Sequence, residues 1–89
     1  MGLNTVEIVL WAEKEFELQL PDEEVSQIYS VGEFSDYLHR KLRTKHGFKS
    51  CPSNEHIFNK IKAILIKDYA VSEYKIIKDA KFIDDLNLQ

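Results

Sequence analysis

The chain has 89 residues, of which 44% are hydrophobic and 30% are charged, as is usual for one small globular domain. No apolar run approaches membrane-spanning length and nothing resembles a signal peptide, so we expect neither a membrane span nor secretion. Cys51 is the only cysteine, which excludes an internal disulfide and favours a reducing, cytoplasmic location.

The net charge of −3 is unevenly distributed along the chain. Residues 1–36 hold nine acids and one base, a net charge of −8, whereas residues 37–89 hold six acids and eleven bases, a net charge of +5. The acidic part suits a partner with lysines and arginines at its docking surface. The lysines of the basic part are scattered and lack interleaved aromatic residues, so we expect a solvated surface and no nucleic-acid binding.

Residues 3–16 have the periodicity of an amphipathic helix. Its apolar positions, spaced by about 3.6 residues, are Leu3, Val6, Val9, Leu10 and Phe16. Asn4 followed by Glu7 resembles a capping box at the start of this helix. The opposite face carries Glu7, Glu13, Glu15 and Glu17, with Lys14 among them. On charge alone, this face is typical of a solvated helix surface.

Two further helices are predicted before residue 43. Pro21 breaks the chain, and Asp22 is a plausible N-cap for a short helix over 22–28. Ser30 and Glu33 have the spacing of a capping box, which opens a longer helix expected over 31–42.

The second part of the chain contains one more helix and an apolar tail. Residues 43–52 are basic, contain Gly47 and Pro52, and are interpreted as a linker. Ser53 is a candidate N-cap for a helix over 54–69, and the tail over 71–86 is too apolar for a free loop. We therefore expect the tail to pack on the bundle with Phe82 and Leu86 buried.

Two stretches of this sequence resemble an acyl carrier protein, in reversed order. The first stretch resembles the second half of that family. It comprises the acidic helix, the residues Leu20-Pro21-Asp22-Glu23-Glu24-Val25 and the helix that follows Ser30. The second stretch resembles the first helix of the family and the end of its long first loop. It comprises residues 57–65 and Phe82-Ile83-Asp84-Asp85-Leu86. The family order is restored by reading 53–89 and then 2–42, so the chain resembles a circularly permuted acyl carrier protein.

This resemblance implies an all-α fold, an acyl-carrier-like bundle of three main helices plus one short helix with permuted connectivity. It places a single domain over 1–89, with the second half of the family fold at 1–42, a linker at 43–52 and the first half at 53–89. Ten linker residues span at most roughly 35 Å, enough to join the family's neighbouring termini.

The resemblance also locates the family's attachment site for phosphopantetheine, a serine at the start of the acidic helix. Gly2 stands at that position and has no oxygen to modify, so we expect no cofactor in the chain as written. The acid before the serine corresponds to Gln89, and the acid two residues after it corresponds to Asn4. The other serines are interpreted as caps or as ordinary surface residues, the latter being Ser26, Ser35, Ser50 and Ser72.

The docking positions that the resemblance retains are Glu7, Leu10, Glu13 and Asp22. They imply partners with basic surfaces, of the acyl-chain-processing or phosphopantetheinyl-transferase type. The function expected is that of a fatty-acid or polyketide type carrier domain unable to carry phosphopantetheine. The alternative is an adaptor module that docks on a basic partner without carrying anything.

Enzymatic and metal-binding roles find no support in the sequence. No nucleophile–base pair or glycine-rich phosphate loop is present, so we expect no catalytic residues. Cys51 with His46 and His56 lacks paired zinc-ligand spacing, and Asp84-Asp85 fits a turn better than a calcium loop. We expect a monomer, and exchange of the tail between two chains is the alternative.

Overall fold

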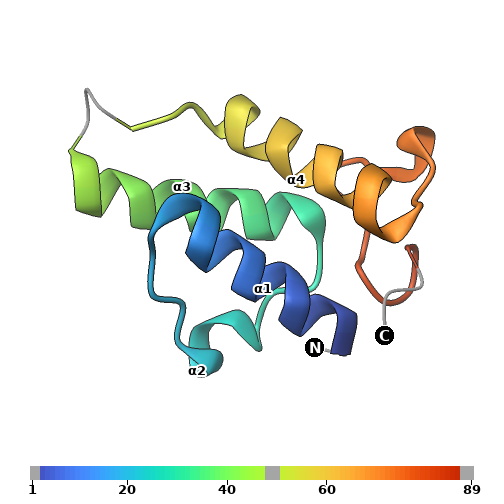
Figure 1. The fold of residues 1–89 in the computed structure, drawn as a ribbon, viewed down its shortest axis with the longest axis horizontal. Helices are drawn as coiled ribbons and strands as arrows, with labels where there is room; N and C mark the ends of the chain where they lie inside the picture. The colour runs from blue at the N-terminus through green and yellow to red at the C-terminus, as the bar shows by residue number, and fades with distance from the viewer. Residues whose placement is uncertain (1–2, 48–50, 87–89) are drawn as a thin grey trace.

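The structure is a computed structural model that describes residues 3–47 and 51–86, with side chains described from Glu7 onward. In the described residues the elements are α1 (Leu3–Phe16), α2 (Asp22–Val25), α3 (Val31–His46), α4 (Asn54–Tyr69) and the short 3-10 helix η1 (Glu73–Lys75). α3 and α4 run antiparallel beside each other, and α1 and α2 lie together below them in the view of Figure 1. The expected all-α bundle of three main helices and one short helix is confirmed.

α3 begins where its capping box predicts and ends later than expected. The Glu33 amide donates to Ser30 Oγ over 3.2 Å, and the Ser30 amide donates to Glu33 Oε1 over 3.0 Å. The helix then continues to His46, beyond the predicted end at residue 42, so it includes the first four residues of the expected linker. Basic residues in a last turn are favourable because the C-terminal end of a helix is partially negative. The prediction ended the helix at residue 42 because Leu42 is the last residue of its apolar stripe.

α4 has the predicted bounds and the predicted cap. The His56 amide donates to Ser53 Oγ over 3.1 Å, as an N-cap serine requires. The helix ends at Tyr69, and Ala70 follows it in the left-handed conformation with φ 55°.

Two expected caps in the first part of the chain are wrong. α1 begins at Leu3, so Asn4 lies inside the helix and cannot be its N-cap. α2 has Pro21 as its N-cap, and Asp22 is its first helical residue. α2 also ends at Val25, before the predicted Ile28, although both of these side chains are buried.

The core is a single apolar cluster that draws on every α-helix and on the tail, defined as residues 71–86. The core residues of the tail are Val71, Ile76, Ala80, Phe82 and Leu86. Phe82 and Leu86 are 2% and 6% exposed, which confirms the prediction for both. The rings of Phe82 and Phe34 meet edge to face with centroids 5.9 Å apart. The tail is therefore an integral part of the bundle.

Backbone hydrogen bonds hold the tail against the start of α3. The amides of Val31 and Gly32 donate to the carbonyls of Ala80 (2.9 Å) and Lys78 (2.8 Å). The Phe82 amide donates to the Tyr29 carbonyl over 2.9 Å. First-turn amides of a helix have no partner within the helix, so the tail supplies two of the acceptors that α3 needs.

Ser35 differs from its interpretation as a surface residue. It is completely buried, and its hydroxyl donates to the Asn54 carbonyl over 3.2 Å and contacts Asn54 Oδ1 at 2.5 Å. Because a buried hydroxyl needs a partner, this serine fixes the start of α4 against α3. Ser26 and Ser72 are exposed as expected, and Ser50 lies outside the described residues.

Candidate functional site

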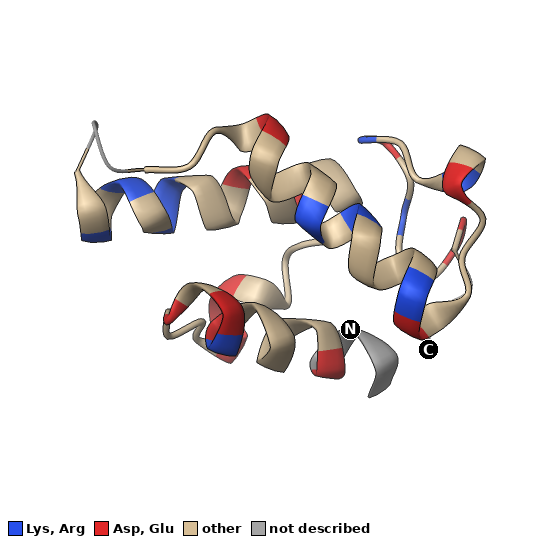
Figure 2. Cartoon of the chain, turned by 45° about the horizontal axis from the view of Figure 1, so that its top comes forward, with Lys and Arg blue, Asp and Glu red and all other residues tan. Residues whose placement is uncertain are grey.

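The acidic side of the molecule is formed by α1 and α2. Figure 2 shows acidic segments on both helices and basic segments on the C-terminal half of α3. Within α1, Leu10 has 58% of its surface exposed, and Glu7 and Lys14 are exposed on either side of it in sequence. An exposed leucine among charged side chains is a suitable centre for a docking surface, with an apolar contact inside a charged rim.

Glu13 has a structural role that the sequence did not predict. It is half-buried, and its Oε2 accepts a hydrogen bond from the Leu20 amide over 3.0 Å. This bond closes the turn that joins α1 to α2. Because Glu13 is half-buried and accepts this bond, part of its hydrogen-bonding capacity is used within the fold.

Glu7 is also held within the fold. Its Oε2 accepts a hydrogen bond from the Tyr69 hydroxyl over 3.3 Å, which joins the first half of α1 to the end of α4. Burial raises the pKa of Tyr69, and the nearby negative charge of Glu7 raises it further. Glu7 remains exposed, so its carboxylate can contribute to a negative surface while it holds the tyrosine.

Asp22 lies in the first turn of α2 together with Glu23 and Glu24, and all three are exposed. The structure thus brings Asp22 into a continuous acidic run on α2 and places Leu10 and Glu7 on α1. It gives no support for a single cluster of all four predicted positions. Gly2, the predicted attachment position, lies outside the described residues.

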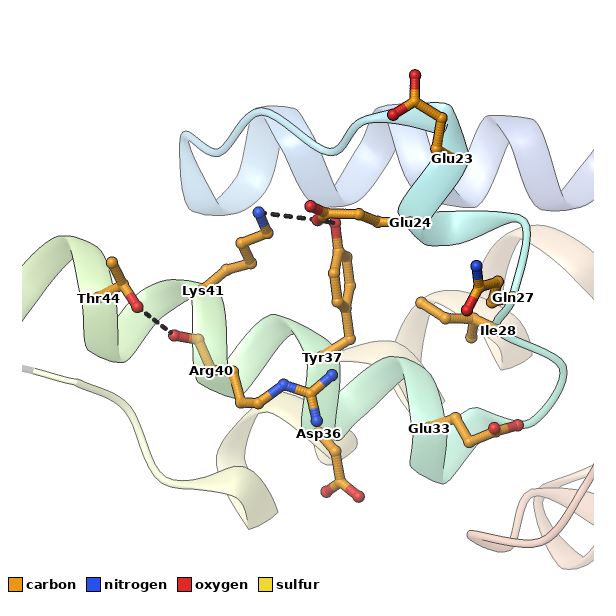
Figure 3. A pocket seen from close by; sticks show the side chains of 10 residues that line it. All are labelled: Glu23, Glu24, Gln27, Ile28, Glu33, Asp36, Tyr37, Arg40, Lys41 and Thr44. Carbon is orange, nitrogen blue, oxygen red and sulfur yellow. Dashed lines mark hydrogen bonds and ion pairs between the residues drawn. The ribbon is translucent and has the colours of Figure 1, made fainter.

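A polar groove of about 730 Å³ lies between α2 and α3, and no pattern in the sequence pointed to it. At its centre Glu24 Oε1 accepts a hydrogen bond from the Tyr37 hydroxyl over 2.6 Å and pairs with Lys41 Nζ at 2.8 Å (Figure 3). Lys41 Nζ also lies 5.6 Å from the centre of the Tyr37 ring. We call these three residues the clasp, because they connect α2 to α3.

The clasp shifts the titration of two of its members. The hydrogen bond from Lys41 lowers the pKa of Glu24, and the hydrogen bond from Tyr37 lowers it further. Burial raises the pKa of Tyr37, and its hydrogen bond to Glu24 adds to that effect. Both shifts favour the states that hold the clasp together at neutral pH, a carboxylate and a protonated phenol. The clasp therefore joins α2 to α3 through hydrogen bonds to a charged carboxylate.

The clasp predicts a specific acid sensitivity. Because the folded-state pKa of Glu24 is below its ordinary value of 4.5, the ionised carboxylate stabilises the fold above that value. This contribution is lost as the pH falls through the lowered pKa. Glu24→Gln should be less stable than the unchanged chain at neutral pH, and the two should converge in acid. Urea denaturation at a series of pH values measures this.

Glu23→Gln is the matched control, because Glu23 is the adjacent exposed acid on α2 and points away from the clasp in Figure 3. The stabilities of Glu23→Gln and of the unchanged chain should not converge as the pH falls. A constant difference between Glu24→Gln and the unchanged chain at every pH would show that the charge of Glu24 is irrelevant.

The structure describes Cys51, His46 and His56, the residues considered above as possible zinc ligands. Cys51 is a free, partly buried thiol that precedes α4, with its Sγ 3.8 Å from the His39 carbonyl. Among residues 3–47 and 51–86, no group of three or more His, Cys, Asp or Glu side chains is placed to bind a metal ion. Within the same residues, none of the helices combines the length and apolarity needed to cross a bilayer.

Comparison with known proteins finds partial matches to acyl carrier proteins. Those from two strains of Porphyromonas gingivalis are each 39% identical to the chain over 42 residues. The match covers 47% of this chain and 54% of each relative, so the chain spans about half the length of the curated relatives it matches. No family model and no solved structure matches. Over these 42 residues the chain is similar to acyl carrier proteins.

Proposed function

We propose that the chain is a circularly permuted acyl-carrier-like domain that docks on basic partner surfaces through α1 and α2 and carries no phosphopantetheine. The observation that carries the docking role is that Leu10, on the acidic helix α1, is 58% exposed. An apolar side chain on a predominantly acidic helix is complementary to an apolar depression rimmed by lysine and arginine.

The length of the sequence match supports the permutation. A permuted chain aligns with an uninterrupted relative over only one of its two halves, and the match covers about half of each chain. The fold supports it too, because α4 and the tail complete the core that α1, α2 and α3 begin. In Figure 1 the start of α1 and the end of the described tail lie on the same side of the molecule. This is the arrangement expected when a connection between them has been moved elsewhere.

The proposed loss of the carrier step depends on Gly2. In the resembled family a serine hydroxyl forms the phosphodiester to phosphopantetheine, and glycine has no side-chain oxygen. Lys14 also reverses the charge at one of the family's mid-helix acids, and Asn4 replaces another acid. Each lost rim charge mainly slows association. We therefore expect partners to associate more slowly with this surface than with that of the family.

A pure adaptor role is the second candidate. It is favoured by the same exposed Leu10 together with the internal bonds of Glu7 and Glu13, which preserve an ordered acidic helix without any attached group. In this role the partner recognises the surface of α1 and α2 alone. In neither role does the chain itself catalyse a reaction.

Intact mass after incubation with coenzyme A and a broad-specificity phosphopantetheinyl transferase tests the proposal. We expect no mass gain for the unchanged chain, because the nucleophilic oxygen is absent. Gly2→Ser should be modified slowly, and adding Asn4→Asp should speed this modification. An acyl carrier protein that has its serine serves as the positive control. A mass gain of one phosphopantetheine group in the unchanged chain would place the attachment at another serine and refute the interpretation of Gly2.

The docking surface is tested in the Gly2→Ser/Asn4→Asp background. Adding Leu10→Glu should slow modification by about tenfold, since it would place an unpaired charge in the apolar centre of the interface. Ile66→Glu is the matched control, because Ile66 is 40% exposed on α4. Equal slowing by both substitutions would show that α1 does not dock on the transferase.

A further inference from the structure

We propose that the tail exchanges between two copies of this chain, which gives a two-fold dimer in which each tail packs on the other copy. The exchange point is Ala70, which joins α4 to the tail. Every residue involved in the exchange, from the end of α4 to Leu86 and from Tyr29 to Phe34, is described in the structure.

The turn at Ala70 is strained. Ala70 has φ 55° and ψ 33°, and the amide of the next residue, Val71, donates to the Leu65 carbonyl over 3.1 Å. Helices that end in this way usually have glycine in the left-handed position, because a Cβ there approaches the following carbonyl oxygen. Alanine carries that penalty and is also the residue that most favours a continued helix.

Nothing in the local sequence prevents α4 from continuing. The chain contains no glycine and no proline after Pro52. Extending α4 through Ala70 removes the left-handed strain and directs the tail away from its own bundle. The tail then needs another docking groove, because its five buried apolar residues would otherwise face water.

We call the start of α3, residues 29–34, the docking groove. Its contacts with the tail do not require that the tail belong to the same chain. They are the hydrogen bonds from Val31 to Ala80, from Gly32 to Lys78 and from Phe82 to Tyr29, together with the edge-to-face contact of Phe82 with Phe34. A second copy supplies an identical tail, so every contact can be reproduced between chains. Two reciprocal exchanges close the assembly with two-fold symmetry.

The closed monomer is favoured in dilute solution, because the covalent connection gives the tail a high effective concentration at its own groove. Refolding at high protein concentration favours the exchanged dimer, since each groove then meets tails from other chains. The two forms interconvert slowly, because the tail must leave the core first. Tail exchange is independent of whether the chain carries phosphopantetheine.

Light scattering after refolding over a range of protein concentrations tests the exchange. The unchanged chain should give a dimer whose fraction rises with concentration. Ala70→Gly removes the left-handed penalty, so it should shift the equilibrium toward monomer by about tenfold for each hinge. Glu17→Gly is the matched control: Glu17 also has a positive φ, 54°, but it directly follows α1 and is remote in sequence from the hinge. It should leave the dimer fraction unchanged.

Mixing two defective copies identifies the exchanged element. Gly32→Val blocks the groove and leaves the tail intact, whereas Phe82→Ala weakens the tail and leaves the groove intact. Refolding the two together should give a one-to-one complex with more helical signal than either variant refolded alone. Absence of any dimer in the unchanged chain, an equal dimer fraction in Ala70→Gly, or failure of the mixed variants to associate would each overturn the proposal.

Discussion

Replacing Phe82 with alanine should lower the free energy of unfolding by about 3–5 kcal/mol, the usual cost of removing a buried phenylalanine. Phe82 is 2% exposed and its ring meets that of Phe34 at an interplanar angle of 80°. The substitution loses both the buried apolar surface and this edge-to-face contact, and the backbone around it is fixed by the Tyr29 bond. Native domains have about 5–15 kcal/mol of total stability, so the loss is a large share.

Ile83→Ala is the control for this experiment. Ile83 is adjacent in sequence, belongs to the same tail and is 38% exposed, so its truncation should cost clearly less. Urea denaturation followed by circular dichroism measures both variants. An unchanged midpoint for Phe82→Ala would mean that the tail does not belong to the core in solution, and it would also remove the basis for tail exchange.

The sequence predicted the elements whose signals are local. α4 and the beginning of α3 follow from Ser53 and from Ser30 with Glu33, because a cap and its partner lie three residues apart. The burial of Phe82 and Leu86 followed from the apolar content of the tail. The end of α3 was misplaced because its last turn is stabilised by charge and has no apolar stripe.

The candidate site was predicted less completely, because its important contacts join residues that are distant in sequence. Nothing near Glu24 in the sequence indicates that it meets Tyr37, and nothing near Ser35 indicates Asn54. The resemblance placed Leu10 at an apolar contact position of the family, and its side chain is 58% exposed. It could not show that Glu13 accepts a hydrogen bond from Leu20, since that bond depends on the path of the turn. The burial of a side chain and its hydrogen-bond partners depend on how the whole chain packs, so the neighbouring sequence does not reveal them.

Gly32→Ala should destabilise the fold, because overpacking usually costs about 1–3 kcal/mol. Alanine within a helix is normally favoured over glycine by about 1 kcal/mol, so two effects oppose each other here. A Cβ at position 32 would lie 2.7 Å from the Lys78 carbonyl oxygen and 3.0 Å from the Lys78 Cβ. The first neighbour is backbone, and it is also the acceptor for the Gly32 amide. Because the tail must shift to relieve the contact, we expect the clash to outweigh the gain in helix propensity.

Gly47→Ala distinguishes a clash with the tail from a general cost of replacing glycine. Gly47 has φ 80° and ψ 174°, a region that essentially only glycine adopts, and a Cβ added there would meet nothing within 4 Å, so alanine costs about 1–3 kcal/mol through backbone strain alone. Amide hydrogen exchange should therefore show lost protection at Phe82 and Ala80 in Gly32→Ala, with their protection kept in Gly47→Ala. If Gly32→Ala were as stable as the unchanged chain and equally protected, the tail could not lie against the first turn of α3. Because a Cβ at position 32 would meet the Lys78 carbonyl oxygen, this substitution directly tests the join between the two halves of the bundle.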